Sequence, residues 1–164
     1  MILYHGSGEE VKHPKIVASN RGLDFGVGFY TTIYKQQAIE WAKRKCNILK
    51  RQGLYRLPVV SVYNIDRDAL KNIFKIKEFR GASEAWLEFV ISNRKSLNMI
   101  HFYDIVIGEV ADDKVFNLID AYEAGFMRKE DVLKRIKYKE KNNQVSFHTE
   151  QVLKYLKFKE AFYC

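Results

Sequence analysis

Four histidines, His5, His13, His101 and His148, are the residues best suited to proton transfer near neutral pH. Two of them together could cleave RNA by acid–base catalysis, although a single histidine is more often a hydrogen-bonded structural residue. Their spacing matches no metal-binding motif, so we expect no metal site. A basic RNA-processing protein that uses His5 and His148 is therefore one hypothesis for this chain.

Glycine-rich phosphate loops are excluded by the glycine spacing. Gly26 and Gly28 form half of a dinucleotide-binding fingerprint, but its third glycine would fall at Thr31, and we predict no strand before it. No phosphate-loop lysine follows a glycine-rich turn either. A Rossmann-type nucleotide site is not expected.

Three segments, taken in order, indicate a function other than metal binding or a phosphate loop. Residues 3–7 predict a strand ending in His-Gly-Ser, residues 26–32 read Gly-Val-Gly-Phe-Tyr-Thr-Thr before a helix, and residues 142–148 form a polar loop running into a strand. In this order the chain resembles the ADP-ribosyltransferase superfamily, in its branch with a His-Tyr-Glu signature. It is more closely similar to a bacterial domain family of that fold, often found as toxins beside small antitoxins. The likeness spans nearly the whole chain, including residues 24–30, 37–42 and 104–108.

The resemblance implies a fold and an activity. The fold would be α+β, an ADP-ribosyltransferase-like split β-sandwich of two small sheets with flanking helices, in a single domain over residues 1–164. The activity would be that of a mono-ADP-ribosyltransferase, an enzyme that cleaves NAD between nicotinamide and ribose and transfers ADP-ribose to a protein or nucleic acid. NAD would be the co-substrate, with no metal, and a small antitoxin protein would be a further partner.

The first strand would supply three of the residues that hold NAD. By resemblance, His5 hydrogen-bonds a ribose hydroxyl on the adenosine side, and the backbone of Gly6 pairs with the nicotinamide carboxamide. Glycine lets a backbone approach a planar ligand closely. The hydroxyl of Ser7 would reach the ribose or a phosphate.

The second segment and the residues on either side of it would supply aromatic contacts and a cation. By resemblance, Tyr30 stacks on the nicotinamide ring and Gly28 leaves room for that face. Trp41, eleven residues after Tyr30, is a second aromatic for the ring, or alternatively a core residue. Arg21 would meet the pyrophosphate, or would be an exposed loop cation.

The sequence departs from the family pattern at two positions. Gln144 stands in place of the catalytic glutamate, and a glutamine can hydrogen-bond a ribose hydroxyl but cannot act as a base. Glu150 would be the fallback carboxylate only if the strand ended at Thr149. Ala38 replaces a serine that binds the carboxamide in some relatives. A non-catalytic module that binds NAD or ADP-ribose therefore remains an alternative to the enzyme.

These residues need strands and helices to position them. Branched and alternating apolar residues predict strands at 2–4, 58–63, 104–110 and 144–148, with a last strand near 156–158. Thr32, Asp66, Ser83 and Thr149 are expected helix N-caps, and helical spacing predicts further helices from about 115 to 124 and around 132–136. Because strands and helices do not alternate regularly, the pattern favours an α+β fold.

Composition and charge narrow the class of protein. Of 164 residues, 47% are hydrophobic and 14% aromatic, so the chain should be globular rather than disordered. It contains no apolar run of roughly 20 residues, no secretory signal and only two cysteines, so we expect a cytoplasmic protein without a membrane partner. The net charge is +8, and no acidic residue lies between Trp41 and Val60. Such a block is a solvated helix face or attracts an anionic partner.

Overall fold

The computed structural model describes residues 1–20, 22–111, 113–137 and 142–164. In this part of the chain the strands are β1 (Ile2–Ser7), β2 (Phe29–Thr31), β3 (Val59–Asn64), β4 (Ile76–Glu78), β5 (Ile105–Gly108), β6 (Gln144–Phe147) and β7 (Lys157–Tyr163). The helices are α1 (Lys35–Arg51), α2 (Arg67–Leu70), α3 (Glu84–Arg94), α4 (Asp113–Glu123), α5 (Lys129–Lys137) and α6 (Glu150–Leu153). None of these helices is long and apolar enough to cross a bilayer.

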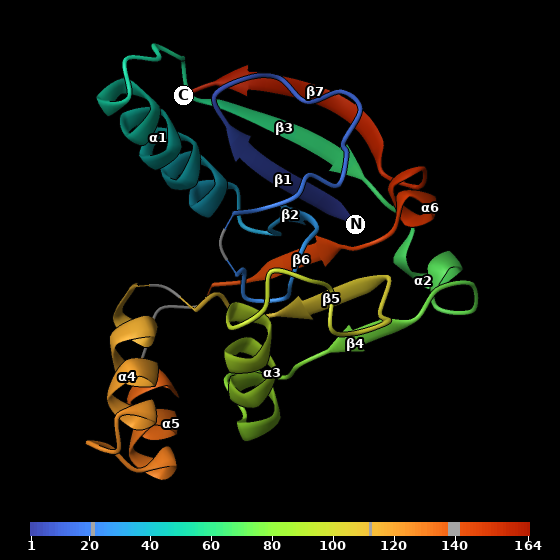
Figure 1. The fold of residues 1–164 in the computed structure, drawn as a ribbon. Helices are drawn as coiled ribbons and strands as arrows, with labels where there is room; N and C mark the ends of the chain where they lie inside the picture. The colour runs from blue at the N-terminus through green and yellow to red at the C-terminus, as the bar shows by residue number, and fades with distance from the viewer. Residues whose placement is uncertain (21, 112, 138–141) are drawn as a thin grey trace.

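The strands form two small sheets, as expected for the fold that the family resemblance implied. The first has the order β1-β3-β7 and is antiparallel throughout. The second has the order β2-β6-β5-β4, in which only β4 and β5 run parallel. The two sheets meet where β1 lies beside β2, and a bridge between Tyr4 and Thr32 joins them there (Figure 1). The fold is therefore α+β, with helices around the two sheets.

Alternation along the strands divides the apolar residues between two main clusters. In β5, Ile105 and Ile107 join a core between the two sheets, while Val106 points to the opposite face. That opposite face packs against α3, where Trp86 is completely buried. A third, smaller cluster lies under α1, which covers the first sheet (Figure 1). The second sheet therefore has a buried apolar layer on each face.

Of the four predicted N-caps, Asp66 and Ser83 cap their helices and Thr32 does not. Thr149 occupies the N-cap position of α6, but its hydroxyl donates to Asp104 Oδ1 at 2.8 Å instead of capping the helix. The side chains of Asp66 and Ser83 accept hydrogen bonds from backbone N–H groups at the starts of α2 and α3. Thr32 does not cap α1, because the helix begins only at Lys35. The Thr32 hydroxyl instead accepts a hydrogen bond from the Tyr34 N–H, at 3.1 Å. This turn separates β2 from α1.

Several element boundaries differ from the sequence-based prediction. β1 continues to Ser7, so His5 lies inside the strand rather than at its end. α2, which follows the predicted cap Asp66, is only four residues long and ends at Leu70. The strands β2 and β4 were not predicted; each has three residues, too few for an alternating pattern to be recognised.

Candidate active site

Gly6 is buried and lies two residues beyond the bridge that joins β1 to β2. Tyr4 donates its N–H to the Thr32 carbonyl at 2.8 Å and accepts the Thr32 N–H at 2.9 Å. Because hydrogen-bonding direction alternates along an antiparallel strand, the N–H and C=O of Gly6 point to the same edge as those of Tyr4. Among the described residues, no strand pairs with β1 beyond this bridge on that edge. The backbone of Gly6 therefore offers one donor and one acceptor side by side.

His5 lies at the junction of the two sheets. Its Nδ1 is 2.7 Å from the Tyr30 carbonyl, and its ring stacks on Phe29 with centroids 4.4 Å apart. Burial lowers the pKa of His5 to about 4; the Tyr30 hydrogen bond opposes this, and the charge of Lys45 adds to it. Since a carbonyl only accepts, Nδ1 carries the proton. Nε2 of this neutral ring is thus a hydrogen-bond acceptor.

Position 6 must be a glycine because helix α1 packs against it. A Cβ at this position would lie 2.1 Å from the carbonyl oxygen of Ala38 and 2.9 Å from the nitrogen of Ala42. α1 therefore packs directly on β1, and this packing requires a glycine independently of any ligand. Gly6 is buried under this contact, and its N–H and C=O lie along the sheet plane rather than toward α1.

Ser7 is buried and engaged in a turn. Its hydroxyl donates to the Glu9 carbonyl at 2.5 Å and accepts the Glu9 N–H at 3.1 Å. Both bonds are local, so in this conformation the hydroxyl proton of Ser7 is not directed at a ligand.

Tyr30 uses its hydroxyl to shape the loop before β2. The hydroxyl donates to the Gly26 carbonyl at 2.6 Å and accepts the Phe25 N–H at 3.1 Å. Burial, together with the negative charge of Asp24, raises the pKa of Tyr30 well above its usual value. The phenol is therefore neutral, and what it can offer a ligand is the face of its ring.

Gln144 is held by a buried polar network centred on Asp24. Gln144 is 7% exposed, and its Nε2 donates to Asp24 Oδ2 at 2.9 Å and to the Glu109 carbonyl at 3.1 Å. The other Asp24 oxygen pairs with Arg94, whose Nε lies 2.6 Å away. Asp24 also accepts the Ala111 N–H at 2.8 Å. The amide nitrogen of Gln144 is thus directed inward, at a carboxylate whose charge Arg94 balances.

The three predicted catalytic residues lie on three adjacent strands, β1, β2 and β6. Tyr30 is directly opposite Ser146, two positions from Gln144, so Tyr30 and Gln144 share one face of the second sheet. His5 packs instead on Phe29, which belongs to the core on the other face. It reaches Tyr30 through the backbone carbonyl only. The structure therefore joins all three strands but places the ring of His5 apart from the other two side chains.

A glutamine that the sequence reasoning missed ties α1 to the start of β6. Gln37 donates to the Asn143 carbonyl at 2.8 Å and accepts the Asn143 N–H at 3.1 Å. These paired bonds set the position of α1 next to Gln144. Gln37 and Asp24 both lie in segments that resemble the family, and this resemblance was the one indication of their importance. Their partners are 106 and 120 residues away in the chain, so the contacts themselves could not be predicted.

Residues 1–158 match the model of a family described as "Protein of unknown function (DUF3990)". The chain belongs to the DUF3990 family. The match covers β1, β2 and β6, and hence all three strands of the candidate site. Searches against curated proteins and against solved structures gave no match.

Three further residues of this DUF3990 protein were assigned to NAD by resemblance: Trp41, Gly28 and Arg21. Trp41 is 48% exposed on α1, so it is not a core residue, and the guanidinium of Arg44 lies 5.9 Å from its ring. A Cβ on Gly28 would lie 2.7 Å from the Phe147 carbonyl oxygen, so this glycine allows β2 to approach the end of β6. Arg21 lies outside the described residues.

His148 does not fit the acid–base role in RNA cleavage. Its Nδ1 lies 2.8 Å from the Val27 carbonyl and its Nε2 lies 2.8 Å from the Ser146 hydroxyl, so both ring nitrogens are engaged. Burial lowers its pKa to about 4, opposed by the Val27 bond, and the neighbouring His101 also lowers it. The ring is a neutral, buried structural group.

Glu150 and Glu109 are two carboxylates near Gln144, one after it in the chain and the other beside it across the sheet. β6 ends at Phe147, and Glu150 begins α6, where its carboxylate accepts the N–H of Ile16 at 3.2 Å. It therefore ties down the loop before β2 rather than supporting Gln144. Glu109 directly follows β5 beside Gln144, and burial raises its pKa. Among the described residues, no three His, Cys, Asp or Glu side chains gather as a metal site would require.

Proposed function

We propose that this DUF3990 protein is a mono-ADP-ribosyltransferase that uses NAD. The observation that supports it most is the edge of β1 at Gly6, which no described strand pairs beyond the bridge to β2, next to the acceptor nitrogen of His5. A primary carboxamide has one N–H donor side and one C=O acceptor, which complement the backbone N–H and C=O of one extended residue. The segments that resemble the ADP-ribosyltransferases supply the same residues.

Each residue has a role consistent with its surroundings. The Gly6 backbone pairs with the nicotinamide carboxamide, and His5 Nε2 accepts a hydrogen bond from a ribose hydroxyl on the adenosine side. The ring face of Tyr30 packs against nicotinamide, which contributes about 0.5–1.5 kcal/mol beyond burial. The side-chain oxygen of Gln144 accepts a hydrogen bond from the nicotinamide ribose, since its nitrogen is held by Asp24.

The reaction breaks the bond between ribose carbon and nicotinamide nitrogen, and the electron pair leaves with nicotinamide. A nucleophile of the macromolecular acceptor forms the new bond to that carbon and releases its proton to solvent. Gln144 supplies no negative charge to the cationic transition state; a carboxylate about 4 Å away would contribute up to about 4 kcal/mol. A single transfer to a reactive acceptor is therefore favoured over chain building. A small antitoxin protein is the partner proposed to neutralise this activity.

The proposal is tested with NAD labelled on its adenylate and His5→Asn as the variant. Asparagine keeps a donor for the Tyr30 carbonyl but removes the acceptor Nε2, so we expect transfer of label to fall at least about tenfold. The matched control is His13→Asn, at an exposed position outside the site. Equal transfer by His5→Asn, His13→Asn and the unmodified protein would contradict the assignment of His5.

A second candidate is a module that binds NAD or ADP-ribose without transferring it. The observation in its favour is Gln144, whose amide nitrogen is buried against Asp24 and whose side chain carries no charge. This candidate predicts that NAD raises the melting temperature while no label reaches a macromolecule. Labelled macromolecule would exclude it.

A further inference from the structure

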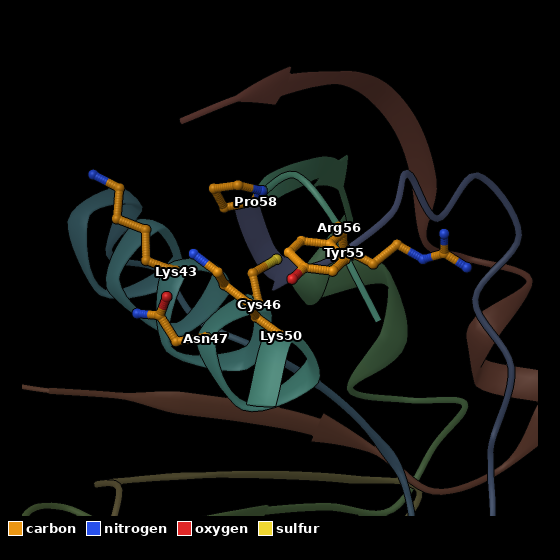
Figure 2. A pocket seen from close by; sticks show the side chains of 7 residues that line it. All are labelled: Lys43, Cys46, Asn47, Lys50, Tyr55, Arg56 and Pro58. Atoms are coloured by element: carbon orange, nitrogen blue, oxygen red, sulfur yellow. The ribbon is translucent and has the colours of Figure 1, made fainter. Parts of the chain in front are cut away.

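A basic pocket lies beside the C-terminal half of α1, away from Tyr30 and Gln144. Its volume is about 320 Å³. α1 supplies one wall with Lys43, Cys46, Asn47 and Lys50, and the chain leading into β3 supplies the other with Tyr55, Arg56 and Pro58 (Figure 2). The lining therefore combines three cations, an amide, a thiol and a phenol, without a carboxylate.

The three cations are not balanced within the structure. No acidic residue occurs between Trp41 and Val60. Among the described residues, none of the ion pairs involves Lys43, Lys50 or Arg56. Three like charges around one cavity repel one another, and an anion bound between them would relieve that repulsion. The pocket is thus suited to a ligand with several negative charges.

An exposed aromatic ring narrows the class of anion. Tyr55 is 74% exposed, and its apolar neighbours Leu54 and Leu57 are 51% and 67% exposed. A cationic groove with an exposed ring is the arrangement that binds unpaired nucleic acid, because phosphates contact the cations while a base stacks on the ring. An acidic protein surface has no need of a stacking face, and a duplex keeps its bases stacked on each other.

The pocket borders the strand that carries the candidate site. A Cβ added to Gly8, just beyond the end of β1, would lie 3.0 Å from the Cβ and 3.3 Å from the Cγ of Arg56. Cys46, in the pocket wall, is two helical turns from Ala38, which contacts Gly6; eight residues of helix span about 12 Å. A ligand in the pocket would thus lie next to the contact between α1 and β1, the contact that also includes Gly6.

We infer that the pocket between α1 and the segment before β3 binds single-stranded nucleic acid, through its phosphates and one stacked base. Lys43, Lys50 and Arg56 contact the backbone, and Tyr55 stacks. This binding requires no NAD, so it is measured independently of the transfer reaction. That the bound strand is also the ADP-ribose acceptor would rest on the proposed function.

Charge contacts are tested by the fluorescence anisotropy of a labelled 12-nucleotide RNA without NAD. The variant Lys43→Gln/Lys50→Gln/Arg56→Gln is expected to bind at least tenfold more weakly. Its plot of log affinity against log salt should be shallower by about 2, since each phosphate contact to a single strand contributes about 0.7. The matched control, which removes three exposed lysines elsewhere, is Lys154→Gln/Lys157→Gln/Lys159→Gln. An equal loss in this control would overturn the inference, because net charge alone would then explain binding.

Stacking and ligand class are tested with the same assay. Tyr55→Ala should weaken RNA binding about tenfold, Tyr55→Trp should retain it, and Tyr163→Ala, at another exposed tyrosine, should have no effect. Unchanged binding by Tyr55→Ala would overturn the stacking contact. Polyglutamate, duplex RNA and unlabelled single-stranded RNA are then added as competitors at equal charge concentration. If polyglutamate or the duplex displaces the labelled RNA as well as the single strand does, single-stranded nucleic acid is the wrong ligand. Displacement of the RNA by an equimolar amount of NAD would assign the pocket to a dinucleotide instead.

Discussion

At the scale of single residues, the surroundings of Gln144 explain why it is a glutamine. Its Nε2 lies between Asp24 Oδ2 and the Glu109 carbonyl, two acceptors that require a donor. A glutamate would place a second buried carboxylate against Asp24. The sequence predicted Gln144 as a site residue but gave no indication of this requirement, because Asp24 and Arg94 are distant from it along the chain.

We expect Gln144→Glu to lower the free energy of unfolding by about 3 kcal/mol, through a lost hydrogen bond and the repulsion of two buried carboxylates. Chemical denaturation measures the change. Gln52→Glu, at an exposed position just after α1, is the matched control and should leave stability nearly unchanged. Adding Asp24→Asn should recover at least about 1 kcal/mol, because the amide at 24 can donate to the new carboxylate. Strictly additive effects of the two substitutions would mean that they do not interact.

At the scale of elements, the site depends on how closely α1 packs on β1. Ala38 and Ala42 approach Gly6 at backbone distance, and Gln37 ties the same helix to Asn143. The sequence predicted α1 from its helical spacing, and it predicted β6 starting at Gln144. It did not predict the role of Gly6 in packing, since a strand pattern shows which residues face inward but not what covers them.

Gly6→Ala should therefore destabilise the protein without touching any catalytic side chain. The new methyl group would overlap the carbonyl oxygen of Ala38, a backbone atom that moves only if α1 shifts. Overpacking of this kind costs about 1–3 kcal/mol, which thermal unfolding would show as a fall of several degrees in melting temperature. Gln36→Ala, on the exposed side of α1, is the control. An unchanged melting temperature for Gly6→Ala would mean that the helix does not rest on this strand.

At the scale of the whole molecule, two sheets meet at one bridge between described residues; His5, which is partly buried, and the buried His101 and His148 lie near that junction. His5 packs between the sheets, whereas His148 and His101 lie against the second sheet with ring centroids 4.7 Å apart. The sequence pattern predicted the longer strands, and the family resemblance implied two small sheets, but neither indicated that β2, a three-residue strand, would join them. Strand contacts between distant segments are long-range packing, which local patterns do not encode.

These histidines make the fold sensitive to acid. Burial lowers the pKa values of His5 and His148 to about 4, and it also lowers that of His101. The unfolded chain therefore binds more protons than the folded protein between about pH 4 and pH 6.5, so stability is lost as the pH falls through this range. The loss is at most about 3 kcal/mol for each of His5 and His148.

Denaturant unfolding at pH 7 and pH 4.5 measures the loss. His148→Asn keeps a donor for the Val27 carbonyl but does not titrate, so its stability should fall less between the two pH values than that of the unmodified protein. The comparison uses each protein's own value at pH 7, which removes any constant cost of the substitution. The same pH dependence with and without His148 would show that this ring is accessible to protons in the folded state.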